Sequence, residues 1–278
     1  MTSQEQALIG RSRPAPPLDA PRSHAYHGPR KGQGGLRALI AIPVYNEEKH
    51  LERVLAEVVR YSPEVLAVND GSTDRSAEIL DAHPFVEVHH HDTNEGYGQS
   101  LLDAFHIAAC RNFDWIVTLD ADEQHDPAAI RVFLQEAARG QADVLSGSRY
   151  LPQSLRETPV PEERRAINIL ITQVLARATP HRLTDAFCGF KAYRVAALER
   201  LNLTETGYAM PLEFWIQAAR AGLRVREIPI TLVYVDPSRH FRGGLDDPRR
   251  RLRLYLDVLD RELVAWAAEK GACAGVAG

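Results

Sequence analysis

Short apolar runs alternate with segments of helical periodicity from residue 37 to about residue 150. The runs are rich in Val, Ile and Leu and predict buried strands at 37–44, 65–70, 86–91, 114–120 and 143–149. Between them, NEEKHLERVLAEVVRY, GYGQSLLDAFHIAA and DPAAIRVFLQEAARG repeat apolar residues three and four positions apart, which predicts helices. This alternation predicts an α/β fold with a mainly parallel sheet covered by helices on both faces.

The pattern is looser outside this region. EERRAINILITQVLARAT and PRRRLRLYLDVLDRELVAWAAEK predict helices, and VREIPITLVYV predicts an extended segment. The N-terminal segment is rich in Pro, Gly, Arg and Ser, which predicts a disordered arm; a basic arm that pairs with an anionic surface is the alternative. We therefore expect an arm over residues 1–36, one α/β domain over 37–248, and a C-terminal helix and tail over 249–278.

Composition narrows the class of protein. The formal net charge of −4 argues against general affinity for nucleic acid. The longest apolar stretches are far shorter than the roughly 20 residues that span a bilayer, and the N-terminus has no apolar signal region. Cys110, Cys188 and Cys273 lie far apart, which indicates neither a disulfide framework nor a zinc site. We expect a cytoplasmic protein.

Carboxylates follow separate predicted strands. Asp70 ends the second strand, and Asp120 and Asp122 end the fourth in WIVTLDADEQHDP. A single such acid is usually a helix cap, but parallel strands bring their carboxyl ends to one edge, where the charges would repel one another. Mg²⁺ or Mn²⁺ is the cation we expect at Asp120 and Asp122, because hard cations prefer oxygen ligands. Asp126 and Pro127 would then begin the next helix.

Two further motifs are open to more than one interpretation. VHHHD has the composition of a metal site, but strand alternation puts His89 and His91 on one face and His90 on the other. We interpret these histidines as structural or surface groups. Gly96 and Gly98 in NEGYGQS free the backbone for a tight turn or for close approach to a ligand.

Six motifs together resemble family 2 glycosyltransferases. IPVYNEE, VNDGSTD, NEGYGQS, LDADEQHDP, GSRY and DAFCGFKAYR occur in the family's order, and polyprenyl-phosphate (dolichol-phosphate) mannose and glucose synthases are the most similar members. The resemblance covers residues 36–235. It implies a GT-A fold, one nucleotide-binding domain with an attached acceptor region. It also implies that a hexose is transferred from a UDP- or GDP-linked sugar to the acceptor. The anomeric configuration would be inverted in a single displacement that depends on Mg²⁺ or Mn²⁺.

The resemblance assigns roles to individual residues on the donor side. The nucleotide-sugar-binding positions are Pro43, Tyr45, Glu47, Asp70, Gly96 and Asp120. The metal-binding positions are Asp120, Asp122 and Gln124, and Asp122 is also counted as catalytic. Glu123 stands where the family often has Gly or Leu; an extra acid there could strengthen metal binding or simply face solvent, and we favour solvent.

The acceptor side has two sets of candidates. A polyprenyl phosphate needs arginines to hold its charge, whereas a hydroxyl needs a carboxylate base. For the phosphate, which we favour, the resemblance implies Arg149 and Arg165. In a basic loop that matches the family only loosely, Arg239 is the candidate phosphate contact, with a solvated charge run as the alternative. For a hydroxyl of a soluble molecule or glycan, Glu213 is a candidate base or a charge favoured at a helix N-terminus. Asp185 is the second candidate, with an acceptor-binding or structural role as its alternative.

The predicted C-terminal helix has an apolar side. An apolar stripe along this helix fits a core or dimer contact, and interfacial docking on a membrane is the alternative: Leu252, Tyr255, Leu256, Leu259, Leu263 and Trp266. The basic run at 249–253 is interpreted as solvated decoration of the helix start.

A catalytically degenerate subunit that only binds nucleotide sugar is the non-enzymatic alternative. A nucleotidyltransferase is disfavoured, because PVYNEE replaces a Gly-rich loop.

Overall fold

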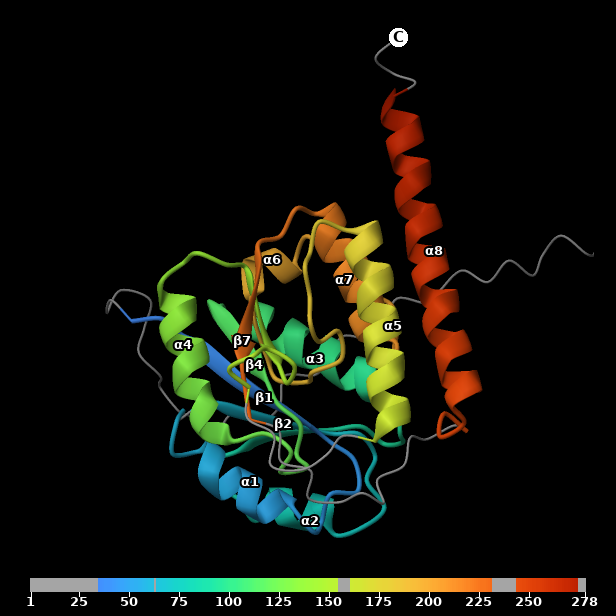
Figure 1. Cartoon of the computed structure of the whole chain (residues 1–278). Helices are drawn as coiled ribbons and strands as arrows, with labels where there is room; N and C mark the ends of the chain where they lie inside the picture. The colour runs from blue at the N-terminus through green and yellow to red at the C-terminus, as the bar shows by residue number, and fades with distance from the viewer. Residues whose placement is uncertain (1–34, 63, 155–160, 232–243, 275–278) are drawn as a thin grey trace, which may run out of the picture. The chain divides into compact units, whose positions relative to one another are not determined.

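A seven-stranded sheet lies at the centre of the computed structural model (Figure 1). The structure describes residues 35–62, 64–154, 161–231 and 244–274, with side chains as far as residue 270. The strands lie in the order β3-β2-β1-β4-β6-β5-β7. Their bounds are β1 Ala38–Val44, β2 Val65–Asn69, β3 Glu87–His90, β4 Trp115–Thr118, β5 Val144–Ser148, β6 Lys191–Arg194 and β7 Val225–Pro229.

Most neighbouring strands are parallel, as predicted. In the register of β1, Ile40 lies opposite Val65 of β2 and Val117 of β4. β6 is the exception, because it runs antiparallel to β4 on one side and to β5 on the other. The five strands expected from apolar runs are all present. β6 was not expected, since its four residues, KAYR, form no apolar run.

Helices cover both faces of the sheet. Their bounds are α1 Leu51–Val58, α2 Ser76–Asp81, α3 Tyr97–Cys110, α4 Ile130–Ala138 after the short turn η1 Pro127–Ala129, α5 Glu162–Ala178, α6 Val195–Leu198, α7 Met210–Arg220 and α8 Pro248–Ala274. Alternate residues of β1 enter different cores: Leu39 faces the core built with α3, α5, α7 and α8, whereas Ile40 faces the core built with α1, α2 and α4. The strands are therefore apolar on both faces.

The local start signals of two helices have different outcomes. Asp126 caps the segment that leads into α4, since its Oδ1 accepts a hydrogen bond from the backbone N–H of Ala128 at 2.9 Å and Pro127 follows it. The helix predicted from residue 46 begins only at Leu51. Asn46 has a φ of 56°, and its side-chain oxygen accepts a hydrogen bond from the N–H of Thr73 at 2.7 Å. Residues 45–50 therefore form a loop beyond β1.

The C-terminal helix packs against α5 and α7. Tyr255, Val258 and Leu259 are buried in this contact, so much of the predicted apolar stripe belongs to the core. Leu256, by contrast, is 41% exposed. None of the helices in the described part of the chain is long and apolar enough to cross a bilayer. The described residues from Leu36 onward form one compact unit, whereas the predicted arm, apart from its last two residues, lies outside the described residues.

Candidate active site

A cavity of about 600 Å³ lies at the carboxyl ends of β1, β2 and β4 and is bordered by residues of α5 and α8. It lies where the sheet order reverses, since β1 has β2 on one side and β4 on the other. The predicted site residues that line it are Pro43, Tyr45, Glu47, Asp70, Gly96, Asp120, Asp122, Gln124 and Arg149. The fold thus brings nine positions from distant motifs together in one space.

Asp70 lies at the end of β2 with its carboxylate held in place by surrounding groups. Its Oδ1 accepts from the backbone N–H of Glu95 at 2.7 Å, and its Oδ2 accepts from Gly96 N–H at 3.0 Å and from Asn94 Nδ2 at 2.8 Å. Nδ1 of the buried His91 lies 2.8 Å from Oδ1. Burial favours the neutral acid, but these hydrogen bonds outweigh burial and lower the pKa of Asp70. Asp70 is therefore a preorganised anion at the cavity wall.

Asp120 and Asp122 lie in the loop after β4. Tyr97 donates its hydroxyl to Oδ1 of Asp120 at 3.2 Å, and the carboxylate packs against Gly189, where an added Cβ would lie 2.2 Å from Oδ2. Oδ1 of Asp122 accepts from the backbone N–H of Gln124 at 3.0 Å. Two carboxylates and the Gln124 amide thus border one cavity. This donor set fits Mg²⁺ or Mn²⁺, whose other positions phosphate oxygens and water would fill.

Glu123, between these ligands, does not line the cavity. It adopts a φ of 58°, and its carboxylate binds Arg53 at 2.6 Å and His50 Nδ1 at 2.7 Å. Glu123 is therefore part of an ion-pair group with α1, where we had expected a carboxylate that simply faces solvent.

Close backbone packing explains the two glycines of NEGYGQS. A Cβ on Gly96 would lie 2.3 Å from the carbonyl oxygen of Thr206, and one on Gly98 would lie 2.4 Å from that of Glu205. The segment at 204–207 therefore packs directly on the start of α3. Gly96 also borders the cavity, so the same contact shapes the cavity wall.

Glu213 accepts hydrogen bonds from the segment at 204–207. Its carboxylate is 1% exposed and accepts from the backbone N–H groups of Thr204 and Glu205 at 2.9 and 2.8 Å and from Thr204 Oγ1 at 2.8 Å. Glu213 is not among the residues that line the cavity. This candidate base is therefore separated from the residues that line the cavity. Its carboxylate oxygens instead accept hydrogen bonds from the loop that packs on Gly96.

Arg149, whose side chain is 17% exposed, and the fully buried Asp185 form a bidentate ion pair. The Nε and Nη2 atoms of Arg149 lie 2.6 and 2.8 Å from the two oxygens of Asp185, and Asn168 donates to Asp185 Oδ1 at 2.8 Å. Burial disfavours the charge on Asp185, but Arg149 outweighs this effect and the pKa of Asp185 falls to about 2. The guanidinium borders the cavity, whereas Asp185 does not. Asp185 thus positions Arg149.

Two arginines that were not predicted as site residues, Arg164 and Arg251, line the cavity. Arg164 of α5 borders it, whereas Arg165, the predicted position, is exposed and outside it, since adjacent helix residues point about 100° apart. Arg251 of α8 is 2% exposed, donates to the carbonyl of Leu245 at 2.6 Å and pairs with Glu163. It is therefore a cavity residue rather than solvated decoration. The spacing of EERRAIN leaves the choice between adjacent arginines open.

Aromatic and apolar side chains surround these arginines. Tyr150, Ile167, Phe187 and Tyr255 all border the cavity. The rings of Phe187 and Tyr255 lie 4.8 Å apart, which joins the DAFCGF segment to α8. Arg239, the predicted loop residue, lies outside the described residues.

The model of the family described as Glycosyl transferase family 2 matches residues 39–201, which carry most of the cavity's donor-side residues. The chain belongs to glycosyltransferase family 2. It is therefore a glycosyltransferase, as its motifs predict. It is 32% identical to undecaprenyl-phosphate mannosyltransferase of Micrococcus luteus over 207 residues, which covers 71% of this chain and 84% of that protein. It is 31% identical to polyprenol monophosphomannose synthase of Mycolicibacterium smegmatis, over 70% of this chain and 77% of that one.

Solved structures give the fold of this family member. Glucosyl-3-phosphoglycerate synthase from Mycobacterium tuberculosis, crystallised with Mn²⁺, UDP and glucosyl-3-phosphoglycerate, superposes with a TM-score of 0.66. The match covers 86% of each chain at 17% sequence identity. The predicted GT-A fold is confirmed by this likeness together with the observed sheet.

Proposed function

We propose that this glycosyltransferase moves a hexose from a nucleotide-diphosphate sugar to a polyprenyl phosphate, with inversion at the anomeric carbon and with Mg²⁺ or Mn²⁺. The observation that carries the proposal is the distribution of charge in one cavity. Carboxylates of Asp70, Asp120 and Asp122 enter from the ends of β2 and β4, whereas Arg149 and Arg164 enter from beyond β5 and from α5.

The carboxylate side suits the donor. Asp70, already anionic and oriented, is placed to accept hydrogen bonds from the base or ribose of a nucleotide. Asp120, Asp122 and Gln124 would hold the divalent ion. When bound, that ion stabilises the negative charge that grows on the departing diphosphate. The solved structure with Mn²⁺ and UDP supports this assignment for the fold.

The arginine side suits an acceptor that is already an anion. Arg149 is locked in orientation by Asp185, and Arg164 and Arg251 add two more guanidinium groups along the same cavity. An acceptor phosphate oxygen would attack the anomeric carbon while the bond from that carbon to the diphosphate breaks, and the nucleoside diphosphate would leave with the bonding electrons. A phosphate carries no proton that must be removed for this step.

The two carboxylates considered as bases for a hydroxyl acceptor do not line the cavity. Glu213 accepts hydrogen bonds from residues 204–205, and Asp185 is occupied by Arg149 and Asn168. A general base must lie within hydrogen-bond reach of the proton that it takes. The geometry of both residues therefore favours the phosphate acceptor. The names of the Micrococcus and Mycolicibacterium relatives support the same choice.

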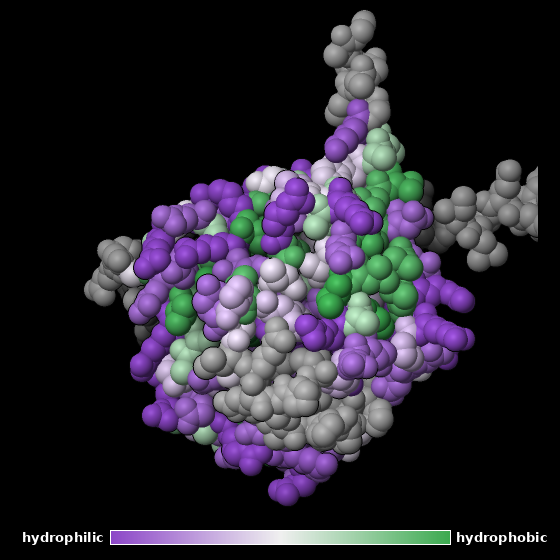
Figure 2. Space-filling view, in the orientation of Figure 1, coloured by the Kyte–Doolittle hydropathy of each residue, from purple (hydrophilic) through white to green (hydrophobic). Residues whose placement is uncertain are grey.

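A peripheral membrane contact follows from a lipid acceptor. Exposed apolar side chains gather on neighbouring parts of α5 and α8, where Figure 2 shows green surface: Ile169, Leu170, Leu256 and Val264 are 41–61% exposed. Arg165, Arg249 and Arg253 are exposed on the same helices. This α5–α8 surface has the composition of an interfacial site on an anionic leaflet. Co-sedimentation with vesicles of phosphatidylglycerol, compared with phosphatidylcholine, tests the contact, and equal absence from both pellets would contradict it.

The decisive experiment is a transfer assay with the full chain. A panel of radiolabelled UDP- and GDP-linked hexoses, mannose first, is incubated with a detergent-solubilised polyprenyl phosphate and Mn²⁺, Mg²⁺ or EDTA. We expect lipid-extractable product with one donor, dependent on the ion, with the opposite anomeric configuration to the donor. The matched control acceptor is the polyprenol without its phosphate, which we expect to be inert. Equal transfer to the alcohol would favour a hydroxyl acceptor, and nucleotide binding without transfer to any acceptor would favour a binding subunit.

A further inference from the structure

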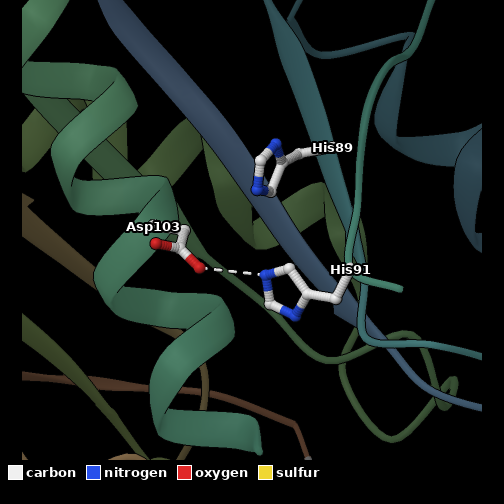
Figure 3. Close-up of side chains that lie close together, drawn as sticks. All are labelled: His89, His91 and Asp103. Atoms are coloured by element: carbon white, nitrogen blue, oxygen red, sulfur yellow. Dashed lines mark hydrogen bonds and ion pairs between the residues drawn. The ribbon is translucent and has the colours of Figure 1, made fainter. Parts of the chain in front are cut away.

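A second group of ligand-type side chains lies between the β3 segment and α3 (Figure 3), and its His91 contacts Asp70. His89 and His91 project from the same face of the strand segment, and Asp103 projects toward them from α3. The His91 Nε2 atom lies 2.9 Å from Asp103 Oδ2. One nitrogen of each histidine and one oxygen of Asp103 all lie within 4.8 Å of one another. Three donor atoms of the kind that bind transition metals therefore converge at one point.

The neighbouring hydrogen bonds orient two of these side chains. The Nδ1 atom of His91, on the far side of its ring, lies 2.8 Å from the Asp70 carboxylate. Gln99 donates its side-chain amide to both oxygens of Asp103, at 3.1 and 3.2 Å. Metal-binding histidines usually donate their second ring nitrogen to a carboxylate, which fixes the tautomer and directs the first nitrogen at the metal. His91 has this arrangement.

The His91 ring lies between two carboxylates. The side chain of His91 is 4% exposed and lies between Asp70 and Asp103, with Glu95 also near enough to act on its charge. Burial disfavours the imidazolium, but the two hydrogen-bonded carboxylates outweigh burial and raise the pKa of His91 to about 9. A proton serves as the cation when no metal is bound. A divalent ion at Nε2 would replace that proton and leave the Nδ1–H bond to Asp70 intact.

We propose that His89, His91 and Asp103 form a site for Zn²⁺ or a similar transition-metal ion, separate from the site for the diphosphate's metal. Donor atoms around a tetrahedral Zn²⁺ lie about 3.3 Å apart, given bond lengths of about 2.0–2.1 Å, so the three donor atoms, now within 4.8 Å of one another, would draw together around the ion. Water would take the fourth position, because His89 and Asp103 are only half-buried. Imidazole ligands select Zn²⁺, Co²⁺ or Ni²⁺ over Mg²⁺, whereas Asp120 and Asp122 offer oxygen alone.

A metal at this site would link the segment after edge strand β3 to α3. It would also hold His91 in the orientation in which its Nδ1 contacts Asp70. Since the metal would be coordinated by two histidines of one strand segment and by Asp103 of α3, it would bind the folded chain more tightly than the unfolded one. Zn²⁺ would therefore raise the melting temperature by mass action. Zn²⁺ binding and the rise in melting temperature do not depend on glycosyl transfer, so their measurement tests this site independently of the proposed function.

The test is metal binding to the metal-stripped full chain in excess Mg²⁺, which occupies the oxygen site. Zn²⁺ is titrated by calorimetry, and Co²⁺ is titrated by the visible absorption of its four-coordinate complexes. His89→Gln and Asp103→Asn each remove one ligand, and His90→Gln is the matched control, since His90 contacts Asn69 and Asp81 on the other side of the strand. Circular dichroism verifies that each variant is folded.

We expect the wild type and His90→Gln to bind Zn²⁺ equally, with the same rise in melting temperature. Each ligand variant should lose affinity by at least the roughly 10- to 100-fold that loss of an outer partner of a metal site costs. The proposal is overturned if the wild type binds neither Zn²⁺ nor Co²⁺ at micromolar concentration. It is equally overturned if His89→Gln and Asp103→Asn, both folded, bind as tightly as His90→Gln, because the metal then lies elsewhere.

Discussion

The buried ion pair between Arg149 and Asp185 allows a stability prediction to be worked out from the structure. Asp185→Asn keeps the shape of the side chain but removes the charge, so the Arg149 guanidinium, whose side chain is 17% exposed, loses the carboxylate to which it donates twice. One pKa unit corresponds to about 1.4 kcal/mol, so a pKa of about 2, against an ordinary value of 3.8, corresponds to roughly 2.5 kcal/mol. Removing one member of a buried pair typically costs about 3–5 kcal/mol. We expect a loss of about 3 kcal/mol at pH 7.

The pH dependence has a defined sign. The folded-state pKa of Asp185 lies below its unfolded value, so its contribution is present above pH 3.8 and disappears as the pH falls through about 2. The difference in unfolding free energy between wild type and Asp185→Asn should therefore be constant near neutrality. It should shrink between about pH 4 and pH 2.

The control is a second aspartate whose pKa is also lowered by arginine but whose arginine partner is more exposed to solvent. Asp143 accepts two side-chain hydrogen bonds from Arg224 and lies 3.2 Å from Arg194 Nε, and its pKa is also about 2, yet the Arg224 and Arg194 side chains are 56% and 34% exposed. Water can replace the lost carboxylate there, so Asp143→Asn should cost about 1 kcal/mol or less. Urea unfolding at pH 7, followed by circular dichroism, measures both variants. The reasoning is refuted if Asp185→Asn costs no more than Asp143→Asn.

Three further predictions concern the cavity. Asp122→Asn should abolish the Mn²⁺-dependent part of UDP or GDP binding in a thermal-shift assay; an unchanged shift would argue against the metal assignment. Gly189→Ala places a Cβ against the Asp120 carboxylate and should weaken the same metal-dependent binding at least about tenfold, with metal-independent binding retained. Arg164→Ala should raise the KM for polyprenyl phosphate by about 10- to 100-fold, the equivalent of one charged hydrogen bond of about 1.5–3 kcal/mol, whereas Arg165→Ala should leave it unchanged. Equal effects of the two arginine variants in steady-state kinetics would contradict the assignment to the cavity.

Local patterns account for the part of the fold that was predicted. The apolar runs that became β1, β2 and β4 are buried on both faces, and their composition shows this without knowledge of their partners. Asp126 and Pro127 act within one turn of chain, so the start of the next helix was also readable. Asp70, Asp120 and Asp122 come together because parallel strands end at one edge.

Long-range packing decided which side chains reach the cavity. β6 enters the sheet between β4 and β5 in the antiparallel sense, and its short sequence gives no sign of this pairing. Glu213 has the position of a base along the chain, but the loop at 204–205 uses its oxygens. Arg251 lines the cavity only because α8 packs back against α5.

The same division applies to the histidines of VHHHD. Strand alternation places His89 and His91 on one face whatever the rest of the chain does. Whether that face meets solvent, a carboxylate or a metal depends on α3, which brings Asp103 to 2.9 Å from His91. Periodicity depends on residues a few positions apart and is therefore contained in the sequence. The partners of a polar side chain come from distant segments, so only the tertiary structure specifies them.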